Sequence, residues 1–119
     1  MKGIRGAISV PEDTAEEITK ATALLLREIV EKNSLAKEEI VSVFFTVTPD
    51  IHAAYPAPAA RNLLGWDDIP LMCMQEMEVA GALARCIRVL LLIERERATQ
   101  VKHVYLREAA ALRPDLIES

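Results

Sequence analysis

Aromatic side chains are scarce in this 119-residue chain, at 4%, and the formal net charge is −4. Proteins that bind nucleic acid need basic surfaces to neutralise phosphates, and those that bind single strands add aromatic rings on which bases stack. The sequence has neither a basic face nor a row of stacking rings. We therefore expect no nucleic-acid partner.

Cysteine is also scarce, and its placement argues against a metal. Cys73 and Cys86 form no C-x-x-C pair, and neither His52 nor His103 stands at ligand spacing. So few cysteines suit a reduced chain, and we expect a cytoplasmic location. No apolar run approaches the roughly 20 residues of a membrane-spanning helix, so no membrane association is expected.

Three familiar catalytic signatures are missing. The sequence contains no Gly-rich phosphate loop, no G-x-S-x-G and no H-E-x-x-H. Nucleophilic, metal and nucleotide chemistry therefore have only weak support. What remains for chemistry is a small set of charged and polar side chains placed among apolar ones.

Apolar residues make up 51% of the chain and charged residues 27%, which is typical of one globular domain spanning residues 1–119. Helical spacing of Ile18, Ala21, Leu25 and Ile29 predicts a helix, and the alternating, β-branched segment I-V-S-V-F-F-T-V-T at 40–48 predicts a strand. The same reasoning predicts strands over 2–10, 40–48, 69–77, 86–94 and 101–107, and helices over about 14–32 and 56–65.

The resulting order, β-α-β-α-β-β-β, predicts an α+β fold with a mixed β-sheet and helices on one face. The opposite face would then expose apolar side chains, so we expect self-association. A chain this short has room for one core but not for a deep private cavity as well. A ligand is therefore expected in a cleft at a subunit boundary.

Arg88 is the most informative single residue. It interrupts C-I-R-V-L-L-L-I at 86–93, a segment whose apolar character predicts a buried strand, and a buried charge is costly unless it is paired. Alternation places Arg88 on the same face as Cys86 and Leu90. Two interpretations remain open: an ion pair with Glu76 of the preceding strand, or a site for a carboxylate or developing oxyanion.

Glu76 and Cys73 belong to the motif C-M-Q-E-M at 73–77. Glu76 is interpreted either as the structural partner of Arg88 or as an acceptor for a ligand hydroxyl. Cys73 has no Cys–His signature, which favours a small buried side chain over a nucleophile. Because the two residues are three apart, an unbroken strand directs them to opposite faces, where they can serve two different pockets.

Arg5, in I-R-G-A, is flanked by Gly3 and Gly6, so it is interpreted either as a ligand-binding side chain or as an edge-strand charge. Tyr105 is either a half-buried ring with a solvated hydroxyl or part of the same site. Taken alone, Arg61 on a short predicted helix is interpreted as a solvated side chain, and Arg113 in the tail indicates little. Several arginines, one glutamate and one tyrosine suit a ligand with two carboxylates and a hydroxyl, and catalysis by positioning and electrostatics.

Six motifs in order carry a family resemblance. They are I-R-G-A at 4–7, T-P-D-I-H-A-A-Y-P-A at 48–57, G-W-D-D-I-P-L-M-C-M-Q-E-M at 65–77, C-I-R-V at 86–89, H-V-Y-L at 103–106 and L-R-P-D-L at 112–116. Through them the chain resembles the monofunctional chorismate mutases of the small trimeric, non-helical class. The resemblance implies a homotrimeric pseudo-α/β-barrel with sites at the subunit interfaces. It also implies rearrangement of chorismate to prephenate, on the route to phenylalanine and tyrosine, without metal, cofactor or covalent intermediate.

The resemblance also implies roles for single residues. It assigns Arg88 to the ether oxygen of the substrate, Arg5 to a carboxylate with help from Tyr105, and Glu76 to the hydroxyl. It places Cys73 of the adjacent subunit near that hydroxyl. The other matching positions are Tyr55, Ala57, Leu71 and Met72 on the side of Cys73, and Arg61, Leu112 and Arg113 near the mouth of the cleft.

Some positions depart from the family pattern. Pro58 stands where a lysine is expected, Tyr55 replaces a phenylalanine and Met72 a threonine. Pro58 weakens any expectation of a second cation on that rim. Two other functions stay open at this stage: a non-catalytic trimeric module that binds dicarboxylates for regulation, and another enzyme on a related trimeric fold, such as an imine-hydrolysing deaminase.

Overall fold

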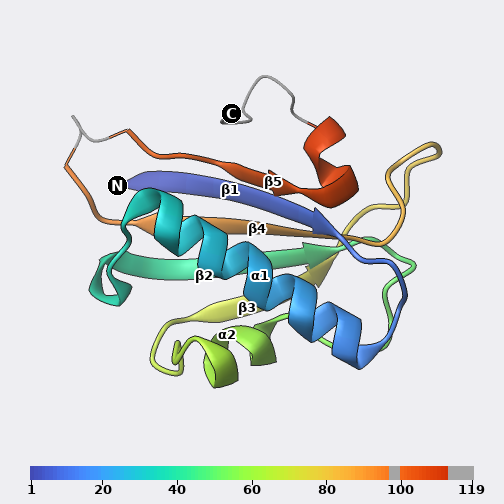
Figure 1. The fold of residues 1–119 in the computed structure, drawn as a ribbon, viewed down its shortest axis with the longest axis horizontal. Coiled ribbons are helices and arrows are strands. Elements are labelled where there is room, and N and C mark those ends of the chain that lie inside the picture. The colour runs from blue at the N-terminus through green and yellow to red at the C-terminus, as the bar shows by residue number, and fades with distance from the viewer. Residues whose placement is uncertain (97–99, 113–119) are drawn as a thin grey trace.

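The computed structural model describes residues 1–96 and 100–112. A five-stranded sheet in the order β3-β2-β4-β1-β5 forms its centre (Figure 1). Strand β4 pairs antiparallel with β1 and β2, whereas β3 is parallel to β2 and β5 is parallel to β1. The mixed sheet predicted from the sequence is thus confirmed. The strands are β1 (Lys2–Ser9), β2 (Ile40–Val47), β3 (Leu71–Gln75), β4 (Cys86–Ile93) and β5 (Val104–Leu106).

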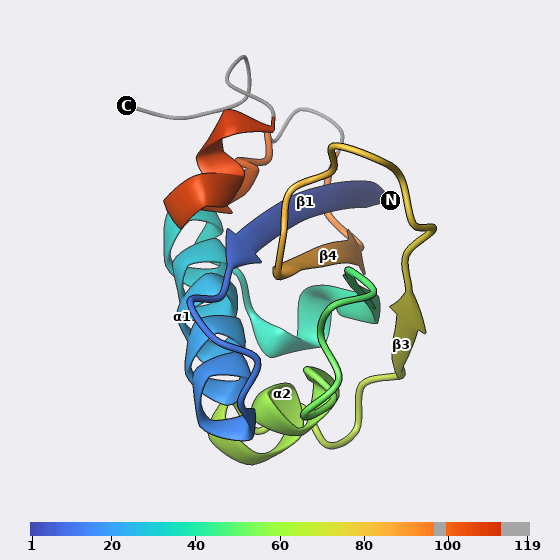
Figure 2. The same cartoon turned by 90° about the vertical axis from the view of Figure 1, so that its right-hand side faces the viewer.

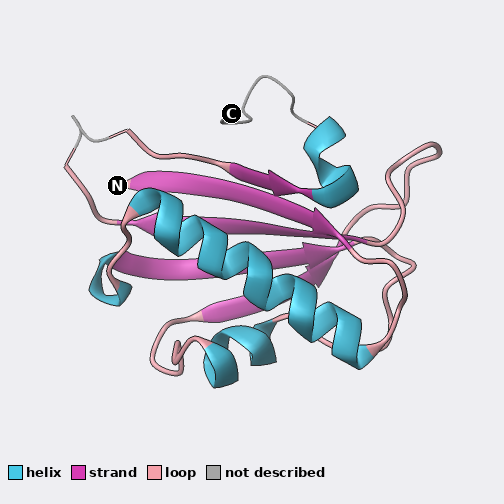
Figure 3. Ribbon diagram, in the orientation of Figure 1, coloured by secondary structure: helices cyan, strands magenta, loops and turns pink. Residues whose placement is uncertain are grey.

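Helices α1 (Ala15–Asn33) and α2 (Ala57–Leu63) cover one face of the sheet, as Figure 3 and the turned view in Figure 2 show. Two short 3₁₀ helices, η1 (Lys37–Glu39) and η2 (Arg107–Ala111), complete the order. The predicted sequence of elements is therefore confirmed. No helix among the described residues is long and apolar enough to cross a membrane.

Helix α1 begins where capping chemistry predicts. The Thr14 side chain accepts a hydrogen bond from the Glu17 backbone N–H at 3.2 Å, which satisfies one of the free donors of the first turn. The helix ends at Asn33, and Ser34 adopts a left-handed conformation with φ of 46°. Between these ends, the apolar stripe of α1 lies fully buried against the sheet.

The opposite face of the sheet is largely open. Met72, Met74 and Leu90 expose 55%, 40% and 39% of their surface there, although apolar side chains of this size are normally covered. Helix η2 covers a corner of this face, where Ala109 packs with Cys86 and a neighbouring alanine of β1. This exposed apolar surface is the one that self-association is expected to cover.

Two predicted strands are shorter than expected, for backbone reasons. Strand β3 starts after Pro70, which has no N–H to donate to a ladder. Strand β5 starts only at Val104, because the two preceding residues bind other partners: the Asn33 side chain binds both backbone groups of Lys102, and His103 Nδ1 accepts from the Arg5 N–H at 2.9 Å.

Candidate active site

A cavity with a volume of about 660 Å³ lies on the open face of the sheet. That is within the usual range for sites that bind small molecules, roughly 300–1,000 Å³. Its lining combines two arginines with apolar and hydroxyl-bearing side chains. The lining includes Arg5, Thr46, Arg88, Leu90, Tyr105 and Leu112.

Strand register brings these residues together from four strands. Ala7 pairs with Arg88 of β4 on one side and with Tyr105 of β5 on the other, and Arg88 pairs with Thr46 of β2. Directly paired residues share a face of the sheet, so these four side chains form one row across it. Arg5 lies one row away, opposite Leu90. The structure thus assembles the predicted Arg5, Arg88 and Tyr105 around one cavity.

Arg88 is not a buried charge. Strand β4 is buried along the helix face, and on its other face only the end at Cys86 is covered, so that 45% of the Arg88 side chain is exposed there. The expectation of a fully buried cation was wrong, because a run of apolar residues does not reveal that one face of the strand remains uncovered. The alternation that grouped Arg88 with Cys86 and Leu90 is confirmed, since all three lie on that second face.

The ion pair between Arg88 and Glu76 is confirmed. Arg88 Nε lies 3.2 Å from Glu76 Oε2, and the Thr46 hydroxyl donates to the same oxygen at 2.7 Å. An ion pair with one partner this exposed contributes only about 0–1 kcal/mol to stability. Stability therefore gives little reason for an arginine here.

Cys86 borders this group without neutralising it. Burial, the largest influence, raises the pKa of the Cys86 thiol to about 11, although the positive charge of Arg88 opposes that change. The thiol is therefore uncharged near neutral pH. Arg88 keeps its positive charge available on the cavity side.

A second cavity, of about 390 Å³, lies on the other side of β3 and is lined by Tyr55 and Cys73. Glu76 instead contacts the arginine of the first cavity, so the opposite orientation of Cys73 and Glu76 agrees with the parity of the strand. Burial raises the pKa of the Cys73 thiol, which argues against a nucleophilic thiolate. Met74 lines both cavities.

The remaining predicted residues are dispersed. Ala57 is buried at the start of α2, Leu71 packs against the core and Met72 is exposed opposite Phe44. Arg61 is exposed on α2, and its charge acts on Cys73. Leu112 lines the first cavity, whereas Arg113 lies outside the described residues.

Thr46 is the site residue that the sequence interpretation missed. It belongs to the alternating segment 40–48, and alternation placed it on the face opposite Phe45. The missing information was the register of β2 against β4, which sets Thr46 beside Arg88 and so within reach of Glu76. Within residues 1–96 and 100–112, no group of three or more histidine, cysteine or acidic side chains is placed to hold a metal ion.

Comparison with known proteins identifies the family of the chain. The family model described as chorismate mutase type I matches residues 1–116. The chain belongs to the chorismate mutase type I family. The enzyme class predicted from the sequence, an isomerase acting in aromatic amino acid biosynthesis, is confirmed with it.

Individual relatives cover almost the whole chain. Chorismate mutase AroH of Bacillus subtilis strain 168 is 46% identical over 117 residues, covering 98% of this chain and 92% of the relative. Chorismate mutase AroH of Thermus thermophilus is 49% identical over 118 residues, covering 98% and 96%. The solved structure of a chorismate mutase from Clostridium thermocellum, Cth-682, superposes with a TM-score of 0.87 at 46% identity, over 93% of this chain and 99% of that one. These matches confirm the predicted chorismate mutase fold.

Proposed function

We propose that this chorismate mutase rearranges chorismate to prephenate in a cleft between two subunits of a homotrimer, with Arg88 as the main electrostatic catalyst. The observation that carries the proposal is the convergence of Arg5, Arg88 and Tyr105 on one 660 Å³ cavity. Chorismate offers two carboxylates, an ether oxygen and a hydroxyl, which match the cationic and polar groups of that cavity.

The chemistry requires no group to donate or accept a proton. In the rearrangement, the ether C–O bond breaks while one C–C bond forms within the same molecule. The rate can therefore be raised by holding the reactive conformer and by stabilising charge that develops on the ether oxygen. A site built from fixed arginines, without an activated nucleophile, suits this type of reaction.

Arg88 is proposed to meet the ether oxygen with its terminal nitrogens. Its Nε is held by Glu76, which fixes the plane of the guanidinium. Negative charge on the ether oxygen is greatest in the transition state, so a fixed cation there favours the transition state over the substrate. Glu76 Oε2 is occupied by Thr46 and Arg88, which leaves Oε1 to accept the hydroxyl of the substrate.

Arg5 and Tyr105 are proposed to bind one carboxylate at the other end of the cavity. Both lie on the β1–β5 side of Arg88 in the strand register. Leu112, which lines this cavity, is proposed to lie near the mouth of the cleft.

The second half of each site is proposed to come from the adjacent subunit. Cys73 and Tyr55 line the cavity on the far side of β3, with Ala57, Leu71, Met72 and Arg61 near them in the chain. The exposed apolar side chains of the open face support burial against another copy. A trimer with three such clefts is the proposed assembly. A cytoplasmic location stays a prediction.

The test is turnover of chorismate, followed by its ultraviolet absorbance, with prephenate identified as the product. Arg88→Ala should lower kcat by at least about 10²–10³-fold, the usual cost of losing one preorganised donor to a developing oxyanion. Arg88→Lys should restore only part of that loss, because an ammonium lacks the planar fork. Near-normal turnover by Arg88→Ala would exclude the electrostatic role of Arg88.

Two further measurements separate the alternatives. Cys73→Ser should reduce turnover only modestly, and a folded but inactive variant would point to a thiol mechanism instead. Light scattering should report three chains per particle. Binding of chorismate without turnover by the wild type would favour the regulatory dicarboxylate-binding module.

A further inference from the structure

We infer that Asn33, at the end of α1, is a positioning residue that sets the register of β5 and thereby places Tyr105 in the active site. The inference rests on the proposed role of Tyr105 in binding chorismate. It gives a role to a buried polar side chain that does not line the active-site cavity.

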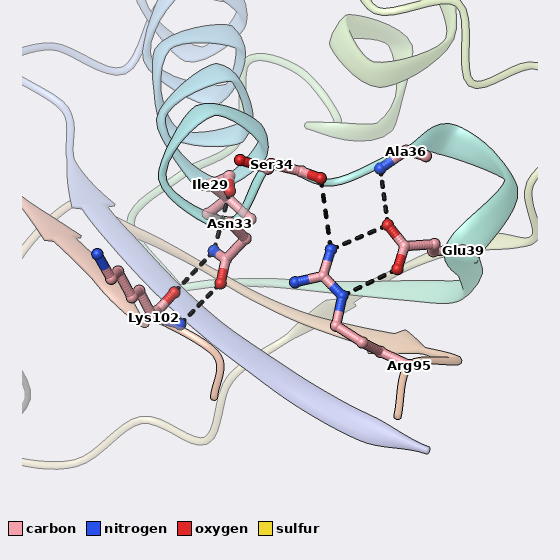
Figure 4. Close-up of polar contacts among 7 residues, drawn as sticks. All are labelled: Ile29, Asn33, Ser34, Ala36, Glu39, Arg95 and Lys102. Atoms are coloured by element: carbon pink, nitrogen blue, oxygen red, sulfur yellow. Dashed lines mark hydrogen bonds and ion pairs between the residues drawn. The ribbon is translucent and has the colours of Figure 1, made fainter. Parts of the chain in front are cut away.

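The amide of Asn33 is fully used (Figure 4). Nδ2 donates to the carbonyl oxygens of Ile29 and Lys102, both at 2.9 Å, and Oδ1 accepts from the Lys102 backbone N–H at 2.7 Å. The side chain is only 7% exposed. Because both backbone groups of Lys102 bind one amide, Lys102 is held in position along the chain and in orientation.

Strand β5 needs such an anchor because it is weak by itself. It has three residues, lies at the edge of the sheet and pairs only with β1. Edge strands this short have few ladder bonds to fix their register. The contact to Lys102 lies just before the strand, and the bond from the Arg5 N–H to His103 Nδ1 follows it. Together these bonds hold the two residues that precede β5, and so add to the hydrogen bonds that β5 makes with β1.

The consequence for Tyr105 follows from strand geometry. Tyr105 is three residues after Lys102 and pairs with Ala7, which in turn pairs with Arg88. A slip of one residue would turn the Tyr105 ring to the helix face, and a slip of two would move it by about 6.6 Å along the sheet. Either change removes the hydroxyl from the cavity, so the register of β5 is a condition for the site.

Loss of the Asn33 contacts could lower activity by misplacing Tyr105 or by destabilising the whole fold. A neighbouring polar contact allows these two effects to be separated. Glu39 binds Arg95 through two hydrogen bonds, at 2.8 and 2.9 Å, close to Asn33 (Figure 4). That contact joins η1 to the segment after β4 and does not involve β5. Glu39→Gln is therefore the matched control, because it weakens a polar contact in the same region that does not hold β5.

The experiment compares wild type, Asn33→Ala, Tyr105→Phe, the double variant and Glu39→Gln in kcat/KM for chorismate, well below their unfolding temperatures. Asn33→Ala should lower kcat/KM about 10-fold or more, as expected when a charge-assisted hydrogen bond to substrate is misplaced. In the Tyr105→Phe background the same change should cost less than about twofold, because the hydroxyl it positions is gone. Glu39→Gln should lower the unfolding temperature and leave kcat/KM within about twofold.

Independent, multiplicative effects of Asn33→Ala and Tyr105→Phe would overturn the inference, and so would an unchanged kcat/KM in Asn33→Ala. Should Asn33→Ala not fold, Asn33→Asp replaces it, because it keeps the acceptor for Lys102 and loses the donor. Amide hydrogen exchange gives a readout without chorismate. Exchange at Val104–Leu106 should accelerate in the Asn33 variant relative to the β1–β4 pairing, and equal exchange refutes the inference even if the wild type has no turnover.

Discussion

Gly6 of β1 offers the sharpest test of how closely α1 packs on the sheet. A Cβ atom added there would lie 2.8 Å from Ile29 Cδ1, 3.1 Å from Val89 Cγ1 and 3.2 Å from Leu25 Cδ1. Carbon atoms pack best at about 3.5–4.0 Å, so Ile29 would have to retreat by roughly 0.7 Å. Ile29 and Leu25 are fully buried and Val89 nearly so, which leaves none of them free to turn into solvent.

We therefore expect Gly6→Ala to be destabilising. Overpacking of a close-packed core costs about 1–3 kcal/mol, and the reduced entropy of the unfolded chain returns about 0.4–1 kcal/mol. The midpoints of these two ranges give a net loss of about 1.3 kcal/mol. Gly3→Ala is the matched control, because the new Cβ would meet its nearest atom, Leu90 Cδ1, at an ordinary 3.4 Å. It should be neutral or slightly stabilising.

The assay is urea unfolding followed by circular dichroism, with both variants and the wild type at one protein concentration. Equal concentration matters because association shifts apparent stability. A lower midpoint with an unchanged slope in Gly6→Ala alone is the expected result. Equal stability of the two alanine variants would mean that α1 can move away from β1 at little cost, and would refute the argument from close packing.

Two other perturbations test the polar contacts. Thr46→Val removes the 2.7 Å hydrogen bond to Glu76 Oε2 and should lower kcat/KM about 10-fold while Arg88 stays in place. Steady-state kinetics with chorismate would measure this change. An unchanged kcat/KM would show that Thr46 has no role in catalysis. Hydrogen bonds from Arg95, and then from the Ala36 N–H, lower the pKa of Glu39 to about 2 from 4.5, so its stabilising contribution is complete above about pH 4.5 and is lost as pH falls toward 2. The difference in unfolding temperature between wild type and Glu39→Gln should accordingly shrink over that range, and a constant difference would contradict the assignment.

The sequence predicts the elements of this fold well because their signals are local. The cap at Thr14, the helical stripe of α1 and the alternation over 40–48 each depend on neighbours within a few residues. Strand order is different. Nothing local indicates that β4 lies between β1 and β2, because that arrangement depends on contacts between segments far apart in the chain. The same holds for Thr46, whose position beside Arg88 follows from register alone.

The site was predicted in part from residue types and in part from resemblance. Residue types alone indicated an ion pair between Arg88 and Glu76 and opposite orientations for Cys73 and Glu76, and the geometry agrees with both. They could not show that Arg88 is half exposed, because exposure of β4 depends on what covers the second face of the sheet. The role of Asn33 was also hidden: its partner, Lys102, is 69 residues away in the sequence.

The position of β3 explains why one chain should not complete a site alone. Among the described strands it pairs with β2 alone, which leaves its other edge free, and Met72 and Met74 are exposed on its open face while Leu71 and Cys73 pack toward the core. Alternation sends Cys73 to one side, while Glu76 after the strand turns to the other, and Met74 borders both cavities. The arginines and the Cys73 cavity are thus separated by the backbone of β3 itself. Side-chain motion cannot bring them together, and a second copy supplying its own β3 edge can, which is the physical reason for proposing an interfacial site.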